Sequence, residues 1–254
     1  MDFDNEHKPE VKRQPAFNAP TIILVGVAAF VIVHVLQKYV LSEVQAFHTL
    51  LRFAFIPLRY DYARLEAENF AFPGGFAGDI WTFVTYSFMH GDWLHLFINA
   101  FWMLAFGSAL ARRFGTLRFL ILSALGSVGG ALLHLGVNWG EPVPMVGASA
   151  AISAHMGAMV RFAFVPYGPL GSPRSNHPGA YFLPSLSIRG VFKNSKALTF
   201  LVIWFAINLI FGVGSSDVAG EGGTTIAWQA HIGGFLVGFL LFPVFDPAKD
   251  LTKV

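Results

Sequence analysis

The stretch FLILSALGSVGGALLHLGVNWG, residues 119–140, contains no Lys, Arg, Asp or Glu and consists mostly of apolar and small residues. A helix that crosses a bilayer needs about 20 such residues, because the hydrocarbon core is about 30 Å thick. Five further stretches have the same character, and they cover residues 14–37, 93–111, 142–160, 197–216 and 222–245. None of the six alternates like a strand of a membrane barrel, so we expect each to form a helix that satisfies its own backbone in lipid.

The composition of the whole chain points the same way. Of its 254 residues, 54% are apolar and 13% are charged, and the mean hydropathy is +0.56. A soluble domain carries about 25% charged residues. The chain has no cysteine, which excludes disulfides, thiolate metal sites and cysteine nucleophiles, and its net charge of +2 gives no reason to expect nucleic acid. The sequence therefore predicts an all-α membrane protein, a six-transmembrane-helix bundle.

The basic residues predict how this bundle lies in the membrane. Six spans put the two tails, residues 1–19 and 246–254, on the same side of the bilayer. If that side is the cytoplasm, all but four of the 17 Lys and Arg residues lie inside. The four exceptions all lie in the first outer loop: they are Lys38, Arg52, Arg59 and Arg64. The positive-inside rule then places both tails in the cytoplasm.

Residues 20–245 form one unit between the tails, without an internal repeat. Its first outer loop, about 38–92, mixes aromatic and charged residues, so we expect it to be partly helical and partly embedded in the membrane interface. The inner stretch 166–195 is rich in Gly, Pro and Ser and is typical of a flexible loop.

Ser149 is the first candidate for chemistry. It lies in PMVGASAAIS, residues 144–153, where a turn-prone segment runs into a helix of small residues. A serine at a helix start lies beside unpaired backbone N–H groups, which favour developing negative charge. Ser149 is therefore either a nucleophile with oxyanion donors next to it or simply an N-cap residue.

His231 is the candidate base that a serine nucleophile needs. It lies in QAHIGGFLVG, residues 229–238, and on a helix Gly234 and Gly238 share its face. Two glycines spaced in this way let a neighbouring helix approach closely, and residues 149–158 offer a similarly slim surface. The serine and the histidine could meet there. Alternatively, His231 only hydrogen-bonds a carbonyl group between packed helices.

His95 and Asn99 are the third element, in MHGDWLHLFIN, residues 89–99. They are four residues apart, so they share one helix face and could bind a single oxygen atom. Neutral side-chain donors of this kind form oxyanion holes. The alternative is a pair of hydrogen bonds between helices. We expect neither a metal nor a cofactor, because His90 and His95 point in different directions on a helix and the chain has no thiolate ligand.

Taken together, the three motifs resemble those of the rhomboid family of intramembrane serine proteases, over about residues 20–245. The resemblance implies a six-helix bundle in which Ser149 is the nucleophile and His231 is the general base and later acid. His95, Asn99 and the backbone N–H of Ser149 would form the oxyanion site. Three glycines would allow close helix packing at the site: they are Gly147, Gly234 and Gly238.

Two positions depart from the family pattern. Ala150 stands where the family usually has a second glycine after the nucleophile, and the methyl group could tighten the helix start without removing the chemistry. The first-loop Trp-Arg pair of the family is replaced by Trp81-Thr82, so the role of that arginine has no obvious counterpart in the sequence.

The function that follows is a serine endopeptidase that cuts the transmembrane segments of single-span membrane proteins near the outer face. Its partners would be these substrates and the lipid bilayer, with no nucleic acid and no metal. We expect it in a bacterial plasma membrane, and an organellar membrane is the alternative. One alternative is a non-catalytic relative that binds or escorts transmembrane segments, but it would not need both a serine and a histidine. The other is a small transporter, which would more often carry acids within its spans.

Overall fold

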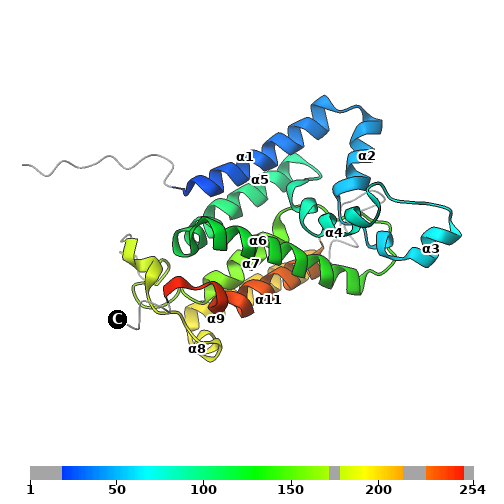
Figure 1. The fold of residues 1–254 in the computed structure, drawn as a ribbon. Helices are drawn as coiled ribbons and strands as arrows, with labels where there is room; N and C mark the ends of the chain where they lie inside the picture. Colours follow the sequence, from blue (N-terminus) through cyan, green and yellow to red (C-terminus); the bar gives the residue numbers. More distant parts are fainter. Residues whose placement is uncertain (1–18, 172–177, 214–226, 249–254) are drawn as a thin grey trace, which may run out of the picture.

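The computed structural model describes residues 19–171, 178–213 and 227–248 (Figure 1). Within these ranges every regular element is helical, apart from one isolated bridge between Phe55 and Met145. The apolar helices are α1 (Thr21–Val35), α5 (Trp93–Trp102), α6 (Ser108–Val137), α7 (Ser149–Val160), α9 (Ser195–Val213) and α11 (Trp228–Phe245). Two π-helical turns, η1 (Leu36–Val40) and η4 (Met103–Gly107), extend α1 and α5.

All six predicted apolar stretches contain one of these helices or a part of one. The second and third stretches lie in two successive helical parts, 93–114 and 116–137, because the backbone at Gly115 is not helical: its φ is 73° and its ψ is 172°. The fourth helix begins at Ser149, so our prediction of helix from residue 142 is wrong at its start. Pro142 and Pro144 disfavour the helical conformation for the residues before them, and Met145 pairs with Phe55 in the isolated bridge, so no helix forms over this segment. Residues 14–18, 214–216 and 222–226 of the predicted stretches lie outside the described residues.

Three helical segments of the described residues are long and apolar enough to cross a membrane: Thr21–Val40, Trp93–Val137 and Trp228–Phe245. The helices over Ser149–Val160 and Ser195–Ile210 are apolar but shorter. Large apolar side chains cover the outer surface of α5, where Leu94, Phe97 and Phe101 are 60–69% exposed. Apolar surface of this extent is unfavourable in water and suits contact with lipid tails.

Helices α6, α7 and α11 form the centre of the molecule and lie side by side (Figure 1). Glycines make this close approach possible, because they leave no side chain between the helix backbones. Gly129 and Gly130 of α6 contact Gly233 and Ala230 of α11, and Gly157 of α7 contacts the backbone of Phe235. Around this core, α1 packs against α5 on one side, and α9 packs against α11 on another.

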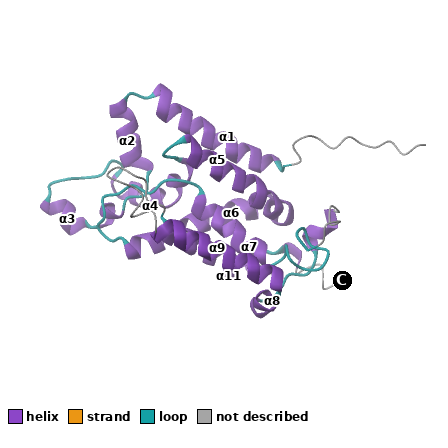
Figure 2. Ribbon diagram, turned by 180° about the vertical axis from the view of Figure 1, so that it is seen from behind, coloured by secondary structure: helices purple, strands orange, loops and turns teal. Residues whose placement is uncertain are grey.

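The short helices gather at the two ends of the bundle, as Figure 2 shows from behind. At one end lie the elements that connect α1 with α5: α2 (Glu43–Phe53), η2 (Pro57–Tyr60), α3 (Tyr62–Ala67), α4 (Gly75–Thr85) and η3 (Tyr86–Phe88). At the opposite end lie α8 (Ile188–Lys193) and η5 (Pro178–Phe182), which belong to the inner stretch that we predicted to be a flexible loop. Ser149 begins α7 at the end that carries α2, α3 and α4.

A buried ion pair fixes the end that carries α8. The guanidinium group of Arg113 on α6 binds both carboxylate oxygens of Asp246, at 2.8 and 2.9 Å, just after α11 ends. Arg113 also donates to the carbonyl oxygens of Tyr181 and Leu183. Arg161 donates to the carbonyl oxygen of Phe239, so two cations hold these ends of the central helices together.

Candidate active site

Ser149 is the first residue of α7, and Ala148 occupies the N-cap position. No side chain caps this helix, so the interpretation of Ser149 as a plain N-cap is wrong. Its side chain is half-buried, and its hydroxyl group has no hydrogen-bond partner in the part of the chain that the structure describes. The first N–H groups of a helix have no acceptor within the helix. The hydroxyl group of Ser149 therefore lies beside free backbone donors.

His95 and Asn99 of α5 both face Gly147, two residues before Ser149. A Cβ atom at Gly147 would lie 2.6 Å from Nε2 of His95 and 3.7 Å from Nδ2 of Asn99. Gly147 has a φ of 114°, which glycine adopts at little cost, and its N–H donates to the carbonyl oxygen of Tyr86 at 3.0 Å. The amide of Asn99 donates to the carbonyl oxygen of His95, within α5, at 3.0 Å. The imidazole and the amide thus approach the start of α7 because no side chain at position 147 keeps them away.

Helix α11 packs against α7 through the two predicted glycines. A Cβ atom at Gly234 would lie 2.8 Å from the carbonyl carbon of Ala150, and one at Gly238 would lie 2.6 Å from that of Ala154. The two contacts are four residues apart on both helices, so the helices run parallel. His231 comes three residues before Gly234, which puts it at the level of Gly147. All three predicted motifs therefore meet around residues 147–150.

No hydrogen bond joins Ser149 and His231 among the described residues. The imidazole of His231 instead lies against α9, where its Nδ1 is 2.7 Å from Oδ1 of Asn208. His231 therefore does not bond to a backbone carbonyl through this nitrogen, as our alternative interpretation supposed. Catalytic hydrogen bonds often form with short, aligned geometry only once a substrate is bound.

His90, just before α5, supports His95 by packing. The two rings are 5.2 Å apart between centroids, and Nδ1 of His34 lies 3.1 Å from the carbonyl oxygen of His90. Burial, and then the charge of the nearby His95, lowers the pKa of His90 to about 3, so this ring is neutral. Within the described residues, no three His, Asp or Glu side chains converge as metal ligands.

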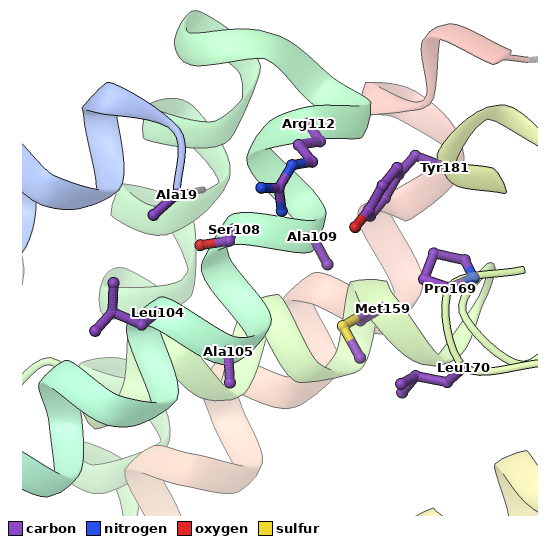
Figure 3. Close-up of a pocket in the computed structure, with 10 residues that line it drawn as sticks. All are labelled: Ala19, Leu104, Ala105, Ser108, Ala109, Arg112, Met159, Pro169, Leu170 and Tyr181. Carbon is purple, nitrogen blue, oxygen red and sulfur yellow. The ribbon is translucent and has the colours of Figure 1, made fainter. Parts of the chain in front are cut away.

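A cavity of about 400 Å³ lies away from this cluster (Figure 3). Its walls include Ser108 and Arg112 of α6, Met159 near the far end of α7, and Tyr181. None of the residues that line it belongs to the three motifs. Because Met159 and Ser149 lie at opposite ends of α7, the cavity and the candidate site occupy opposite ends of the bundle.

Residues 77–246 match the model of the Rhomboid domain. The chain belongs to the rhomboid family. Among curated proteins it is similar to the rhomboid protease GlpG of Yersinia enterocolitica (serotype O:8 / biotype 1B) and that of Yersinia pestis (strain Pestoides F), each 28% identical over 165 residues. The rhomboid protease GlpG of Yersinia pseudotuberculosis (serotype I, strain IP32953) is 30% identical over the same length. Each match covers 64% of this chain and 47% of the relative, so the chain spans about half the length of the curated relatives it matches.

The packing explains how this rhomboid accommodates alanine at position 150. The methyl group of Ala150 faces Gly130 of α6, where an added Cβ atom would lie only 2.5 Å from it. The same atom would lie 2.7 Å from the carbonyl oxygen of Ala230 on α11. Gly130 has no side chain, so the methyl group of Ala150 fits between α7 and α6.

Helix α4, which contains Trp81 and Thr82, is held by residues of η2 and α2. Thr82 is buried, and its hydroxyl group lies 2.9 Å from that of Tyr60, whose pKa burial raises to about 12. The indole N–H of Trp81 donates to the carbonyl oxygen of Arg52 at 2.9 Å, and the Arg52 guanidinium group lies 5.7 Å from the Trp81 ring centroid. A tryptophan–arginine contact therefore exists in this rhomboid, with an arginine from α2. The second arginine of the loop, Arg59, is buried and donates to the carbonyl oxygens of Leu51 and Pro73.

Two groups of this rhomboid were not assigned a role from the sequence. The first is Asn208, a polar residue within the predicted apolar stretch 197–216, where polar side chains are costly and often functional. The second is the Arg113–Asp246 ion pair, in which Arg113 counted only as a basic residue of an inner segment. Neither contact can be predicted from a local sequence motif, because the partners are far apart in the sequence.

Proposed function

We propose that this rhomboid is an intramembrane serine endopeptidase in which Ser149 is the nucleophile and His231 is the general base. The observation that supports this most strongly is the meeting of three helices at one level. Helix α5 brings His95 and Asn99 against Gly147, and α11 brings His231 to the same level beside the start of α7. A binding protein or a transporter has no need for this combination around a free serine hydroxyl group.

The arrangement suits acyl transfer. When a peptide carbonyl group lies over the start of α7, the Ser149 hydroxyl oxygen attacks the carbonyl carbon while His231 takes the hydroxyl proton. The tetrahedral intermediate carries its negative charge on the former carbonyl oxygen, and we assign His95, Asn99 and the Ser149 N–H as its donors. His231 then gives the proton to the leaving amine. Water then takes the place of the amine: His231 removes a proton from the water as its oxygen attacks the acyl carbon, and returns that proton to the Ser149 oxygen as the carboxylic acid leaves.

The substrates that we propose are transmembrane segments of single-span membrane proteins, cut near the outer face. Ser149 and His231 belong to apolar helices, so the scissile bond must approach them from within or beside the bilayer. A spanning helix keeps its peptide bonds hydrogen-bonded, and residues with low helix propensity near the cut make them accessible at a lower cost. We therefore expect Gly, Ser or Pro close to the cleavage site.

We also propose the topology: six spans, within the core of residues 20–245, with both tails in the cytoplasm of a bacterial cell. The cations at the end that carries α8 support this orientation, since Arg113, Arg161 and Lys193 all lie there. The site would then open at the outer end, beside α2, α3 and α4. The plasma membrane of a bacterium is the proposed location because the relatives reported above come from Yersinia species.

The test is cleavage of tagged single-span proteins by the purified chain in proteoliposomes. We expect the wild type to cut some of them and Ser149→Ala to cut none. Ser153→Ala removes the same group one turn further along α7 and is the matched control, which should retain activity. Equal cleavage by the wild type and Ser149→Ala would contradict the proposal, and so would the absence of cleavage and of fluorophosphonate labelling in the wild type.

A further inference from the structure

Asn208 is a buried amide in the apolar helix α9, with 8% of its surface exposed. A polar group at such a position is costly unless its donors and acceptors are paired. Asn208 has two partners: its Nδ2 donates to the carbonyl oxygen of Trp204 at 2.8 Å, and its Oδ1 lies 2.7 Å from Nδ1 of His231. The first bond lies within α9, and the second crosses to α11.

The first of these bonds fixes the direction of the second. A backbone carbonyl oxygen only accepts hydrogen bonds, so the atom that faces Trp204 must be the NH₂ group of Asn208. The atom that faces His231 is then the amide oxygen, which also only accepts. Nδ1 of His231 must therefore carry the hydrogen. In the neutral ring the other nitrogen, Nε2, is left with a free lone pair, which is the form that a general base needs.

The helices around this bond are held in register on both sides. One turn from Asn208, the ring of Trp204 stacks on Phe235 of α11, with 4.5 Å between centroids and an interplanar angle of 27°. One turn in the other direction, Gly212 lies against the indole ring of Trp228, where a Cβ atom would lie 2.5 Å from Cγ. The Asn208–His231 bond thus lies between two packed contacts of α9 with α11.

We propose that Asn208 is a positioning residue for catalysis: it holds His231 in the Nδ1–H tautomer and aims its Nε2 atom toward Ser149. This inference rests on the function proposed above. Asn208 contacts neither the nucleophile nor the substrate. Its amide is neutral, so it orients the imidazole of His231 by a hydrogen bond and not by a charge. In a serine protease whose base is held by a carboxylate, losing the correct tautomer costs about 10⁴-fold in kcat. We expect a smaller loss here, of about 10- to 100-fold, because no ionic partner is removed.

Three variants separate positioning from structural support. Asn208→Leu removes the acceptor and should lower kcat by about 10- to 100-fold with KM within about twofold of the wild type. Asn208→Asp keeps an acceptor oxygen at the same place and should recover at least part of the lost rate. Ser123→Ala is the matched control, because it removes another buried bond to an imidazole, 2.8 Å from Nε2 of His155, away from the site. It should change kcat by less than about twofold at equal folded protein.

The ¹⁵N spectrum of histidine-labelled protein provides the readout that a purely structural role would leave unchanged. The His231 signals, identified by their loss in His231→Gln, should be those of the Nδ1–H tautomer in the wild type and of a tautomer mixture in Asn208→Leu. An unchanged kcat in Asn208→Leu would overturn the inference, and so would a lower kcat with an unchanged His231 spectrum. If the wild type and Ser149→Ala are equally inactive, the proposed function fails, and Asn208 has no catalytic role to support.

Discussion

Replacing Gly234 with alanine should separate the two helices that carry the candidate dyad. The new Cβ atom would lie 2.8 Å from the carbonyl carbon of Ala150 and closer still to its oxygen, whereas ordinary contacts of a Cβ atom begin at 3.4 Å. The carbonyl carbon alone therefore requires a shift of about 0.6 Å, the difference of these two distances, and the oxygen requires more. Both atoms belong to helix backbones that cannot move without the rest of the helix.

This shift should affect kcat more strongly than it affects the free energy of unfolding. Overpacking costs about 1–3 kcal/mol, and alanine in place of glycine within a helix offsets roughly 1 kcal/mol of that. A misplacement of about 1 Å between catalytic groups lowers the rate by about 10²-fold. We therefore expect Gly234→Ala to lower kcat by about 10- to 100-fold, while the protein stays folded with a free energy of unfolding reduced by at most about 2 kcal/mol.

The assay is the initial rate of cleavage of a fluorescent single-span substrate in proteoliposomes, at equal folded protein, together with thermal unfolding in detergent. Gly136→Ala is the matched control: it makes the same change within helix α6, where a Cβ atom would meet nothing within 4 Å. It should leave kcat unchanged and leave the Tm equal or slightly higher. A Gly234→Ala variant with the kcat and Tm of the wild type would refute this reasoning, because α7 and α11 could not then be in contact at Ala150.

Three further predictions test the oxyanion donors, the packing of the central helices and the buried histidine of the loop. Asn99→Ala should lower kcat by about 10²- to 10³-fold in the same cleavage assay, since one oxyanion donor is worth about 2.7–4 kcal/mol. Gly126→Ala should lower the Tm, because its Cβ atom would lie 2.5 Å from that of Ala154, and the added change Ala154→Gly should restore most of the loss. The free energy of unfolding of the wild type should fall as the pH drops from 6.5 toward 3. Burial lowers the pKa of His90 in the folded protein to about 3, so between these two pH values the unfolded chain binds one more proton than the folded protein. His90→Gln should weaken this dependence of Tm on pH.

Each of these predictions has an outcome that contradicts it. For Asn99→Ala it is a kcat within about twofold of the wild type. For the packing pair it is a double variant no more stable than Gly126→Ala alone, which would mean that the two residues do not meet. For His90→Gln it is a Tm that falls with pH below 6.5 as steeply as that of the wild type.

The helices could largely be predicted because lipid imposes a simple rule on the sequence. A stretch without charges that is long enough to span must be helical, and each such stretch contains a helix or a part of one. The rule gives the length of a span but not its boundaries. It did not show that the fourth helix begins only at Ser149, or that the helices of the second and third stretches meet at a break at Gly115. Those details depend on prolines and on a glycine with a positive φ. Their effects on the backbone are local, and the positions of the charged residues do not reveal them.

The candidate site was predictable where its residues share a helix face, and less so where partners come from different helices. His95 and Asn99, like His231, Gly234 and Gly238, are linked by helical spacing, so a single sequence indicates that they lie together. The contact between Asn208 and His231 has no such spacing, because it depends on how α9 packs against α11. The packing of Ala150 against Gly130 is also invisible in the sequence, since it joins α7 to α6.

The most direct test of the central claim is to map where a fluorophosphonate reacts. The wild type, labelled in proteoliposomes and digested, should carry the adduct on the peptide that contains Ser149, and His231→Ala should carry almost none at equal folded protein. This result is expected because only a serine activated by a base reacts readily with the probe. An adduct on another serine of the wild type, or equal labelling of Ser149 in His231→Ala, would contradict the assignment of Ser149 and His231 as nucleophile and base.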